Sequence, residues 1–309
     1  QKKIRSVEEK IAKNYKNNKM RCPTHLSIGQ EAVAAATGLA LNSKDIAISY
    51  HRSHAHFLSK GGEPKKLFAE LHGYEEGCSK GVGGSMHLID LKNNFYGSTA
   101  IVSNSIPIGV GLAYSLKLAK KKNIVCIYIG DAAVEEGVFF ESINFSILKK
   151  LPVVFICENN FFSVYTHLKN RQPPQRKIYK LAKAMGAISY KLKQDNPFKL
   201  FQKIKNIFDN VRKNPFTNFI EIETCRYLEH CGPNDDSKLG YRSLKELTKW
   251  KKKDPLIFSK NYLIKSKLIS KKKIEILDKK IINSVDKDFI YLKNLKKPKF
   301  KNINKLVYK

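Results

Sequence analysis

The pattern of apolar and polar positions begins with a helix. Ile4, Val7, Ile11 and Tyr15 recur every three or four residues between charged side chains. This is the spacing of an amphipathic helix with one buried face. Pro23 cannot continue a helix, so we expect this one to end before it.

Two further helices and a long loop are predicted after this opening element. A run of small residues at 32–36 suits a closely packed helix, with Ser27 as its N-cap. Residues 73–105 contain several glycines and predict a long connection, and loops of that length are usually functional. A helix with a proline in its first turn is then expected at 105–121.

Two continuous apolar runs predict the centre of a sheet. Residues 124–129 and 153–157 are apolar at nearly every position, which is typical of strands covered on both faces. The residues between them predict a helix at 136–149, and the whole is a βαβ unit with a right-handed crossover. With a later strand at 219–223, the chain is expected to form an α/β fold, a mainly parallel sheet flanked by helices.

The last third of the chain is polar and rich in lysine. Residues 226–242 offer few apolar anchors, so we expect a loop that is mobile until a ligand orders it. Residues 256–309 predict lysine-rich helix, and no linker separates them from 1–255, so residues 1–309 are expected to form a single domain. One apolar stripe in this region is interpreted as core or subunit contact, and it comprises Ile274, Leu277, Ile281, Val285 and Phe289.

Composition limits the classes of protein that fit. A chain of 309 residues that is 42% hydrophobic can bury a sizeable core. Its apolar stretches are shorter than the roughly 20 residues of a membrane helix, and nothing at the N-terminus indicates secretion, so we expect a cytoplasmic protein. The six cysteines form no CxxC pair and are predicted to be buried free thiols. Cys225, His230 and Cys231 lack the further ligands of a zinc site.

The net charge of +31 raises nucleic-acid binding as an alternative function. The charge is uneven, because residues 1–160 carry 21 basic and 14 acidic side chains while residues 161–309 carry 37 and 13. Most of the excess is lysine outside the motif-bearing half, with little arginine for base or phosphate recognition. We therefore interpret it as solvated lysine surface, and expect no nucleic-acid partner.

The candidate chemistry lies at the ends of the two central strands. Asp131 follows the first strand and Asn160 follows the second, and the carboxyl ends of neighbouring parallel strands meet at one edge of a sheet. Oxygen donors of these two kinds suit Mg²⁺, and Gly130 allows the backbone to approach a phosphate closely. The alternative is that both residues belong to ordinary turns.

Six segments around these residues resemble one enzyme family. They resemble the alpha subunit of thiamine-diphosphate-dependent dehydrogenases that act on pyruvate, branched-chain 2-oxo acids or acetoin. The resemblance covers about 1–255, and its segments are HLSIGQEA (25–32), HRSHAHFLSKGG (51–62), GCSKGVGGSMHL (77–88), AIVSNSIPIGVGLA (100–113), LPVVFICENN (151–160) and EHCGPNDDSKLGYRS (229–243). It implies the thiamine-diphosphate-binding fold.

The resemblance also implies roles for individual residues. It assigns Mg²⁺ to Asp131, Asn160 and the backbone carbonyl of Phe162. Arg52 and His54 are expected to hold the cofactor diphosphate, and His54 is also a candidate catalytic residue.

Two further residues receive roles in the same way. Val102 is expected to be the apolar wedge under thiamine diphosphate, although core packing would also explain it. His230 is expected beside the diphosphate and the substrate, as a catalytic histidine. For both His54 and His230 the alternative is an exposed loop histidine.

Two positions depart from the family pattern. Ala132 replaces the second glycine of the cofactor motif, where a methyl group adds strain if φ is positive. His51 stands where many relatives have tyrosine. Both positions lie beside expected cofactor contacts, so cofactor affinity could differ from that of relatives.

The implied activity is that of an oxidoreductase acting on oxo groups. The enzyme would decarboxylate a pyruvate-like 2-oxo acid or cleave acetoin, and pass the acyl group to a lipoyl acyltransferase. The resemblance further implies a beta subunit, in an α₂β₂ assembly, because the glutamate that activates the cofactor comes from that chain. Residues 163–166 and 171–173 look less like the central pyruvate enzyme, so an acyloin-forming or sugar-modifying transferase remains the alternative.

Overall fold

The computed structural model describes residues 1–20 and 22–296 and is built on one central sheet. All pairings in this six-stranded sheet are parallel, which confirms the predicted α/β class. In spatial order the strands are β2 (Phe95–Ser98), β1 (Ile46–Ser49), β3 (Val125–Gly130), β4 (Val153–Asn159), β8 (Asn218–Glu223) and β7 (Ile188–Lys193). The three strands predicted from sequence are β3, β4 and β8.

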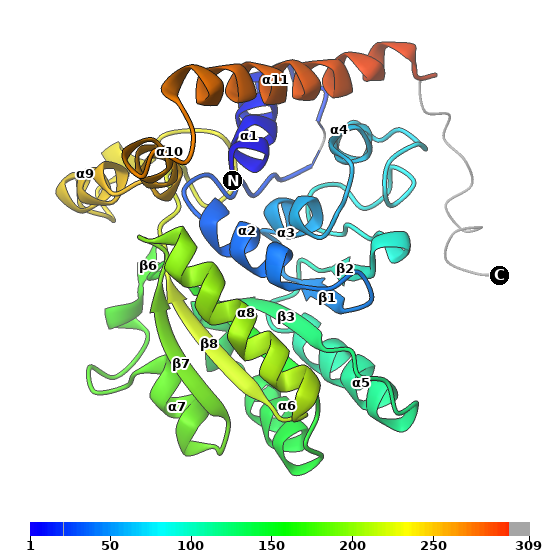
Figure 1. Ribbon diagram of the computed structural model, residues 1–309, viewed down its shortest axis with the longest axis vertical. Helices are drawn as coiled ribbons and strands as arrows, with labels where there is room; N and C mark the ends of the chain where they lie inside the picture. Colours follow the sequence, from blue (N-terminus) through cyan, green and yellow to red (C-terminus); the bar gives the residue numbers. More distant parts are fainter. Residues whose placement is uncertain (21, 297–309) are drawn as a thin grey trace.

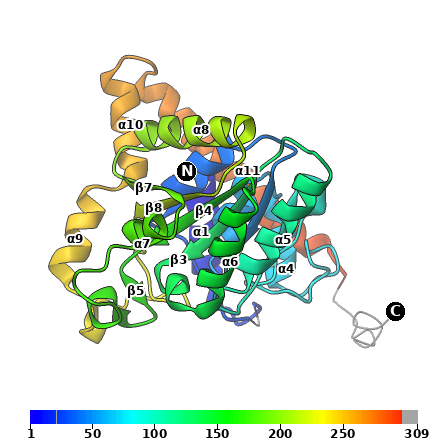
Figure 2. The ribbon, with the colours of Figure 1, turned by 90° about the horizontal axis from the view of Figure 1, so that it is seen from below.

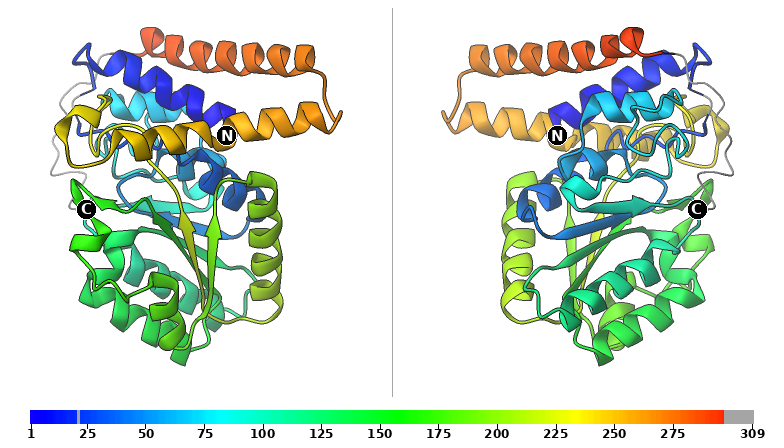
Figure 3. Two further views of the ribbon diagram at one scale, coloured as in Figure 1. Left: turned by 90° about the vertical axis from the view of Figure 1, so that its left-hand side faces the viewer. Right: turned by 90° about the vertical axis from the view of Figure 1, so that its right-hand side faces the viewer.

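Helices cover both faces of this sheet (Figures 1 and 2). Successive strand residues point to opposite faces, so Ile127 and Phe155 belong to one buried cluster and Tyr128 and Ile156 to the other. The first cluster contains residues of α5 (Ser105–Leu118), α6 (Gly137–Leu148) and α7 (Ile178–Ala184). The second contains residues of α2 (Glu31–Ala40) and α8 (Pro197–Lys213). Figure 3 shows α6 and α8 on opposite sides of the sheet.

A further group of helices packs outside α2. Figure 1 shows α11 (Lys271–Ile290) lying across α1 (Lys2–Tyr15) at the top of the molecule. The other helices of this group and its neighbours are α3 (His54–Ser59), α4 (Pro64–Leu71), α9 (Leu244–Lys252) and α10 (Pro255–Lys265). No helix in residues 1–20 and 22–296 is long and apolar enough to span a membrane.

The apolar stripe of α11 is only partly core. Val285 is buried and the Phe289 ring meets Phe68 of α4 edge-on, with 5.2 Å between centroids. Leu277 is 42% exposed. Core contact therefore explains the C-terminal half of the stripe better than its middle, and residues 297–309 of the predicted lysine-rich region lie outside the described residues.

The predicted N-cap of the second helix is wrong. The helix begins at Glu31 with Gln30 as its N-cap residue, and Ser27 lies before it. The amide of Gln30 instead donates to the Ser27 carbonyl at 2.9 Å, closing a turn in which Gly29 has a φ of +97°. This left-handed glycine separates Ser27 from the helix.

The glycine-rich connection at 73–105 contains one short strand, β2, that the sequence did not reveal. Residues 79–84 of this connection are held by the buried carboxylate of Glu70. One Glu70 oxygen accepts from the amides of Ser79 (2.7 Å) and Gly81 (2.9 Å), and the other from Gly83 (2.7 Å) and Gly84 (3.1 Å). Charge-assisted bonds of this kind fix a loop that has little apolar content of its own.

The cysteines are free thiols, as predicted. Burial was predicted for all of them, but only three are buried. The buried ones are Cys126, Cys157 and Cys225, and the partly exposed ones are Cys22, Cys78 and Cys231.

Candidate cofactor site

The two expected metal ligands lie at one edge of the sheet. Asp131 directly follows β3 and Asn160 directly follows β4, and the register of these parallel strands pairs Gly130 with Glu158. Asp131 is 2% exposed. The side-chain oxygen of Asn160 accepts from the amide of Phe162 at 3.0 Å, which holds the third expected ligand close by.

The segment after β3 is a 3-10 turn, Asp131–Glu135, and α6 begins only at Gly137. The helix therefore begins one residue after the start predicted from the sequence, residue 136. Ala132 lies in this 3-10 turn and is not among the residues with positive φ, so its methyl group adds no backbone strain. Gly130 also has a negative φ of −87°, and a Cβ there would meet only Tyr50, at 3.9 Å.

A cation from another segment already contacts Asp131. The Arg171 guanidinium forms an ion pair with the Asp131 carboxylate and another with Glu135, the latter at 2.5 Å. Burial raises the pKa of the Asp131 carboxyl, and the Arg171 charge opposes that shift. Gln172 donates to the same Glu135 oxygen at 2.8 Å. Nothing in the sequence pattern indicated a contact with Arg171, because 40 residues separate it from Asp131.

The expected diphosphate contact Arg52 is a buried cation without an anionic partner. Arg52 is 2% exposed and donates to the carbonyls of Leu26 (2.7 Å) and His230 (3.0 Å). Its Nε has no hydrogen-bond partner, and no ion pair joins it to a carboxylate, within the described part of the chain. Burial lowers the pKa of this guanidinium to about 10. A buried charge without a counter-charge is costly, which indicates a site for an anion.

Three histidines cluster near Arg52. The ring centroids of His25, His51 and His230 lie 4.7 to 5.4 Å apart. Burial lowers the pKa of all three, to about 2 for His51 and about 3 for His230, and Arg52 lowers them further. The rings are therefore neutral near pH 7.

Three neutral imidazoles whose ligand atoms lie within 4.8 Å of one another could in principle bind a metal ion. The guanidinium of Arg52 is 3.5 Å from Nδ1 of His230. A positive charge at about 5 Å opposes each added unit of cation charge by roughly 3 kcal/mol at an effective dielectric constant near 20. The cluster therefore favours an anion, to which neutral imidazoles can donate N–H bonds.

Both ring nitrogens of His54 are engaged by neighbouring side chains. Its Nδ1 is 3.4 Å from Glu8 and its Nε2 is 2.8 Å from the Ser85 hydroxyl, and the side chain is fully buried. The alternative of an exposed loop histidine is therefore wrong. Its predicted contact with the cofactor and its predicted catalytic role stay predictions, and this geometry favours support of the Arg52 segment.

Val102 is exposed, and this excludes core packing as its explanation. It is 48% exposed, and the neighbouring Ile101 is 66% exposed. The hydroxyl of Ser103 donates to the carbonyl of Ala133 at 2.9 Å, which ties this loop to the turn that carries Asp131. An exposed valine beside the site is compatible with the wedge role expected of it.

A buried tyrosine links the two halves of the site. Tyr50, at the end of β1, donates to the Glu158 carboxylate of β4 at 2.6 Å. His56 lies 3.3 Å from the same carboxylate oxygen. This contact passes over β3 and fixes the segment that carries Arg52 against the segment that carries Asn160.

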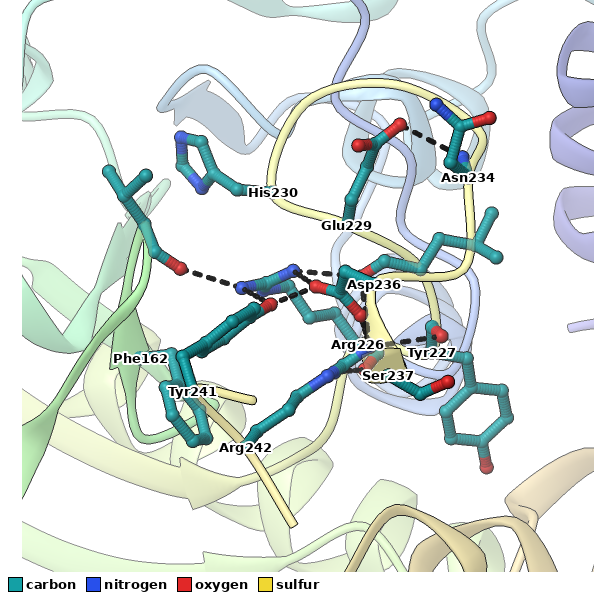
Figure 4. A network of polar contacts seen from close by, with 12 residues as sticks. Phe162, Arg226, Tyr227, Glu229, His230, Asn234, Asp236, Ser237, Tyr241 and Arg242 are labelled. Carbon is teal, nitrogen blue, oxygen red and sulfur yellow. Dashed lines mark hydrogen bonds and ion pairs between the residues drawn. The ribbon is translucent and has the colours of Figure 1, made fainter. Parts of the chain in front are cut away.

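The polar loop at 226–242 is anchored by buried charges (Figure 4). The Asp236 carboxylate accepts from Arg226 at 3.2 Å and also from Arg242 and Tyr241. Arg226 further donates to the Val164 carbonyl at 2.7 Å. Figure 4 shows His230 projecting from this loop. The expected lack of apolar anchors is only partly right, because Tyr227 is buried and Leu228 packs against the core, while buried ion pairs hold the rest of the loop.

The chain is similar in sequence to known enzyme subunits. Residues 1–301 match the sequence pattern of the family described as "Dehydrogenase E1 component". The similarity therefore extends beyond residues 1–255, where the motifs placed it. The chain is 37% identical over 287 residues to the pyruvate dehydrogenase E1 component subunit alpha of Rickettsia felis, covering 92% of this chain and 87% of that protein. For the Rickettsia typhi protein the identity is 36% over 278 residues, covering 90% and 84%. The chloroplastic subunit alpha-3 of Arabidopsis thaliana is 31% identical over 289 residues, covering 91% and 66%.

Proposed function

Because the chain belongs to the dehydrogenase E1 component family, as an alpha-type chain of these thiamine-diphosphate-dependent oxidoreductases, we propose that it binds the diphosphate half of the cofactor through Mg²⁺. The observation that carries this proposal is the placement of Asp131 and Asn160 after adjacent parallel strands, with Arg52 buried and unpaired at the same edge. Asp131 and Asn160 offer oxygen ligands to a cation, and Arg52 offers positive charge to an anion.

The residues present fit a magnesium diphosphate. Asp131 and Asn160 offer two side-chain oxygens, and the Phe162 carbonyl is proposed as the third ligand. Such a set leaves positions for phosphate oxygens, as Mg²⁺ commonly requires. The unpartnered Nε of Arg52 fits a phosphate oxygen.

When bound, thiamine diphosphate supplies a nucleophilic carbon that adds to the substrate carbonyl and an electron sink for the bond that breaks. This chain would orient it and exclude water. We propose that Val102 supports its rings and that His230 holds the diphosphate. His25 and His51, whose ring nitrogens lie within 4.8 Å of each other and of His230, are proposed to hold the carboxylate of a 2-oxo acid.

We propose a pyruvate-like 2-oxo acid as substrate and a lipoyl group as acyl acceptor, because the relatives named above are pyruvate dehydrogenase subunits. Acetoin is a second candidate. A non-lipoyl transferase is the alternative that residues 163–166 and 171–173 suggested. Nucleic-acid binding is not carried forward, since residues 1–301 match an enzyme family. The cytoplasmic location stays a prediction.

A beta-type partner, in an α₂β₂ assembly, is proposed to complete the site. Thiamine catalysis needs a carboxylic acid at the aminopyrimidine ring, far from the diphosphate. Near the metal ligands, Glu135 is bound by Arg171 and Gln172, and Glu158 by Tyr50. Glu136 is exposed beside the metal turn. None of these three glutamates is free and suitably placed, which supports the implication of the family resemblance that the acid comes from another chain.

The test is activity of the chain with and without its partner. The assembled enzyme is assayed for release of carbon dioxide or acetaldehyde from pyruvate, branched-chain 2-oxo acids and acetoin, with a lipoyl acceptor present. We expect turnover of a 2-oxo acid by the assembly and none by the isolated chain. Turnover by the isolated chain would contradict a site shared between two chains. Product formation that does not require the lipoyl acceptor would favour the transferase.

A further inference from the structure

The contact between Arg171 and Asp131 has a consequence for cofactor loading. Arg171 is 11% exposed in its side chain, and Asp131 is 3% exposed. Three of the guanidinium nitrogens are engaged, by Asp131, by Glu135 and by the Thr166 carbonyl at 3.2 Å. The side chain is thus held in one geometry by contacts with two acidic residues and one backbone group.

The Asp131 carboxylate cannot bind the Arg171 guanidinium and a metal ion at the same time without strong repulsion between them. A guanidinium and Mg²⁺ on one buried carboxylate are positive charges within a few ångströms of each other, in surroundings where Coulomb repulsion is strong. Mg²⁺ carries twice the charge and approaches oxygen to about 2.1 Å, whereas a guanidinium nitrogen stays about 2.8 Å away. The metal can therefore displace the arginine, but at a cost.

We propose that Arg171 is an internal competitor of the metal ion, and that Mg²⁺–thiamine diphosphate binds only when Arg171 leaves Asp131. This inference rests on the proposed role of Asp131 as a metal ligand. Glu135 gives the displaced guanidinium a second carboxylate to stay on. The exchange thereby needs a short side-chain movement, without unfolding of the segment between β4 and α7.

The same residue belongs to the segment that carries a metal ligand. Arg171 follows the hairpin of β5 (Phe162–Ser163) and β6 (Thr166–His167), and its amide donates to Leu168 at 3.0 Å. Release of Arg171 from Asp131 would alter the restraint on the hairpin that contains Phe162. Arg171 therefore couples the two sides of the proposed metal site as a positioning residue.

The test is a Mg²⁺ titration of thiamine diphosphate binding, read by calorimetry, in enzyme assembled with its partner and stripped by a chelator. We expect Arg171→Gln to lower the Mg²⁺ concentration for half-saturation by about tenfold or more. Glu135→Gln should raise it, because the displaced guanidinium then has no second carboxylate. Arg176→Ala removes an exposed arginine of the same segment and should change nothing.

The outcomes separate this inference from the proposed function. If the wild-type enzyme binds thiamine diphosphate without Mg²⁺ dependence, the metal assignment itself is wrong. If the wild type depends on Mg²⁺ but Arg171→Gln binds equally or more weakly, Arg171 is a structural or cofactor-binding residue and the competition is refuted. Should Arg171→Gln fold poorly by circular dichroism, Arg171→Lys keeps the charge but is too short to reach both carboxylates, and it should also bind Mg²⁺ more tightly.

Discussion

Asp236 is the residue on which the loop at 226–242 depends, and its substitution gives the sharpest test of the structure. Its side chain is fully buried between Arg226 and Arg242, whose side chains are 2% and 5% exposed. Asp236→Asn keeps the shape but removes the single negative charge that the two guanidinium groups share. The arginines keep only uncharged partners, such as the Leu228 carbonyl (2.8 Å) and the Tyr241 hydroxyl (2.9 Å) for Arg226.

The expected loss of stability in Asp236→Asn arises because two buried cations, Arg226 and Arg242, are left without a counter-charge. Removing one partner of a buried ion pair costs about 3–5 kcal/mol. Asn still accepts one hydrogen bond, so we expect the lower end, about 3 kcal/mol. If the loss is confined to the loop, its opening equilibrium rises by roughly two orders of magnitude.

Hydrogen exchange followed by mass spectrometry measures this opening. Amides at 226–242 should exchange roughly a hundredfold faster in Asp236→Asn, while those of β3 and β4 stay protected. Asp235→Asn is the matched control, because Asp235 is exposed and only accepts from the Ser237 amide at 2.8 Å. It should change stability by less than about 0.5 kcal/mol.

Equal exchange of the loop in Asp236→Asn and wild type would refute the reasoning. It would mean that the loop is held by contacts other than the buried charges. The earlier expectation, that the loop orders only with cofactor, is tested by the same measurement on wild type with and without thiamine diphosphate. The buried charges favour a loop that is already folded, so any added protection should centre on His230.

Two other predictions concern the cofactor site. Asp131→Ala and Asn160→Ala should each abolish Mg²⁺-dependent binding of thiamine diphosphate, measured by calorimetry, without loss of the circular dichroism spectrum; unchanged affinity in either would falsify the ligand assignment. The histidine cluster should make stability depend on pH, because folding lowers the pKa of His51 to about 2 and that of His230 to about 3. Below about pH 6.5 the unfolded chain therefore binds more protons than the folded chain, and the free energy of unfolding falls as pH falls. Urea titrations at about pH 7 and about pH 5 should show this fall, with a smaller one in His51→Tyr, and parallel curves for both proteins would contradict it.

The strands that the sequence revealed are those in the middle of the sheet. β3 and β4 lie between two other strands and are covered by helices on both faces, so nearly every position is apolar. β7 is an edge strand in which five of the six residues ISYKLK are partly or fully exposed, and Lys191 pairs with Glu223 at 2.6 Å. Its polar pattern resembles a loop or an exposed helix, and only its pairing with β8 makes it a strand. β1 escaped detection because four residues are too few for a pattern.

In the site, too, residues placed by local sequence were predictable, and contacts between distant segments were not. Asp131 and Asn160 were predictable because a βαβ unit fixes where its strands end. Arg171 and Asp236 were not, because ion pairing depends on which distant segments the fold brings together. His54 was predicted from its motif neighbours, but motif position does not reveal whether ring nitrogens are already bonded to Glu8 and Ser85.

The distribution of charge at the sheet edge indicates what kind of ligand the site accepts. Arg52 follows β1 and Asp131 follows β3, and the pairing of Ile48 with Ile127 brings both segments to the same edge. Arg52 repels a bare cation, and Asp131 and Glu135, which share the single positive charge of Arg171, repel a bare anion. A ligand that carries a metal ion at one end and phosphate at the other satisfies both groups at once. Mg²⁺ alone should therefore bind far more weakly than Mg²⁺ with diphosphate, because it has to displace Arg171 from Asp131 and leaves the charge of Arg52 uncompensated.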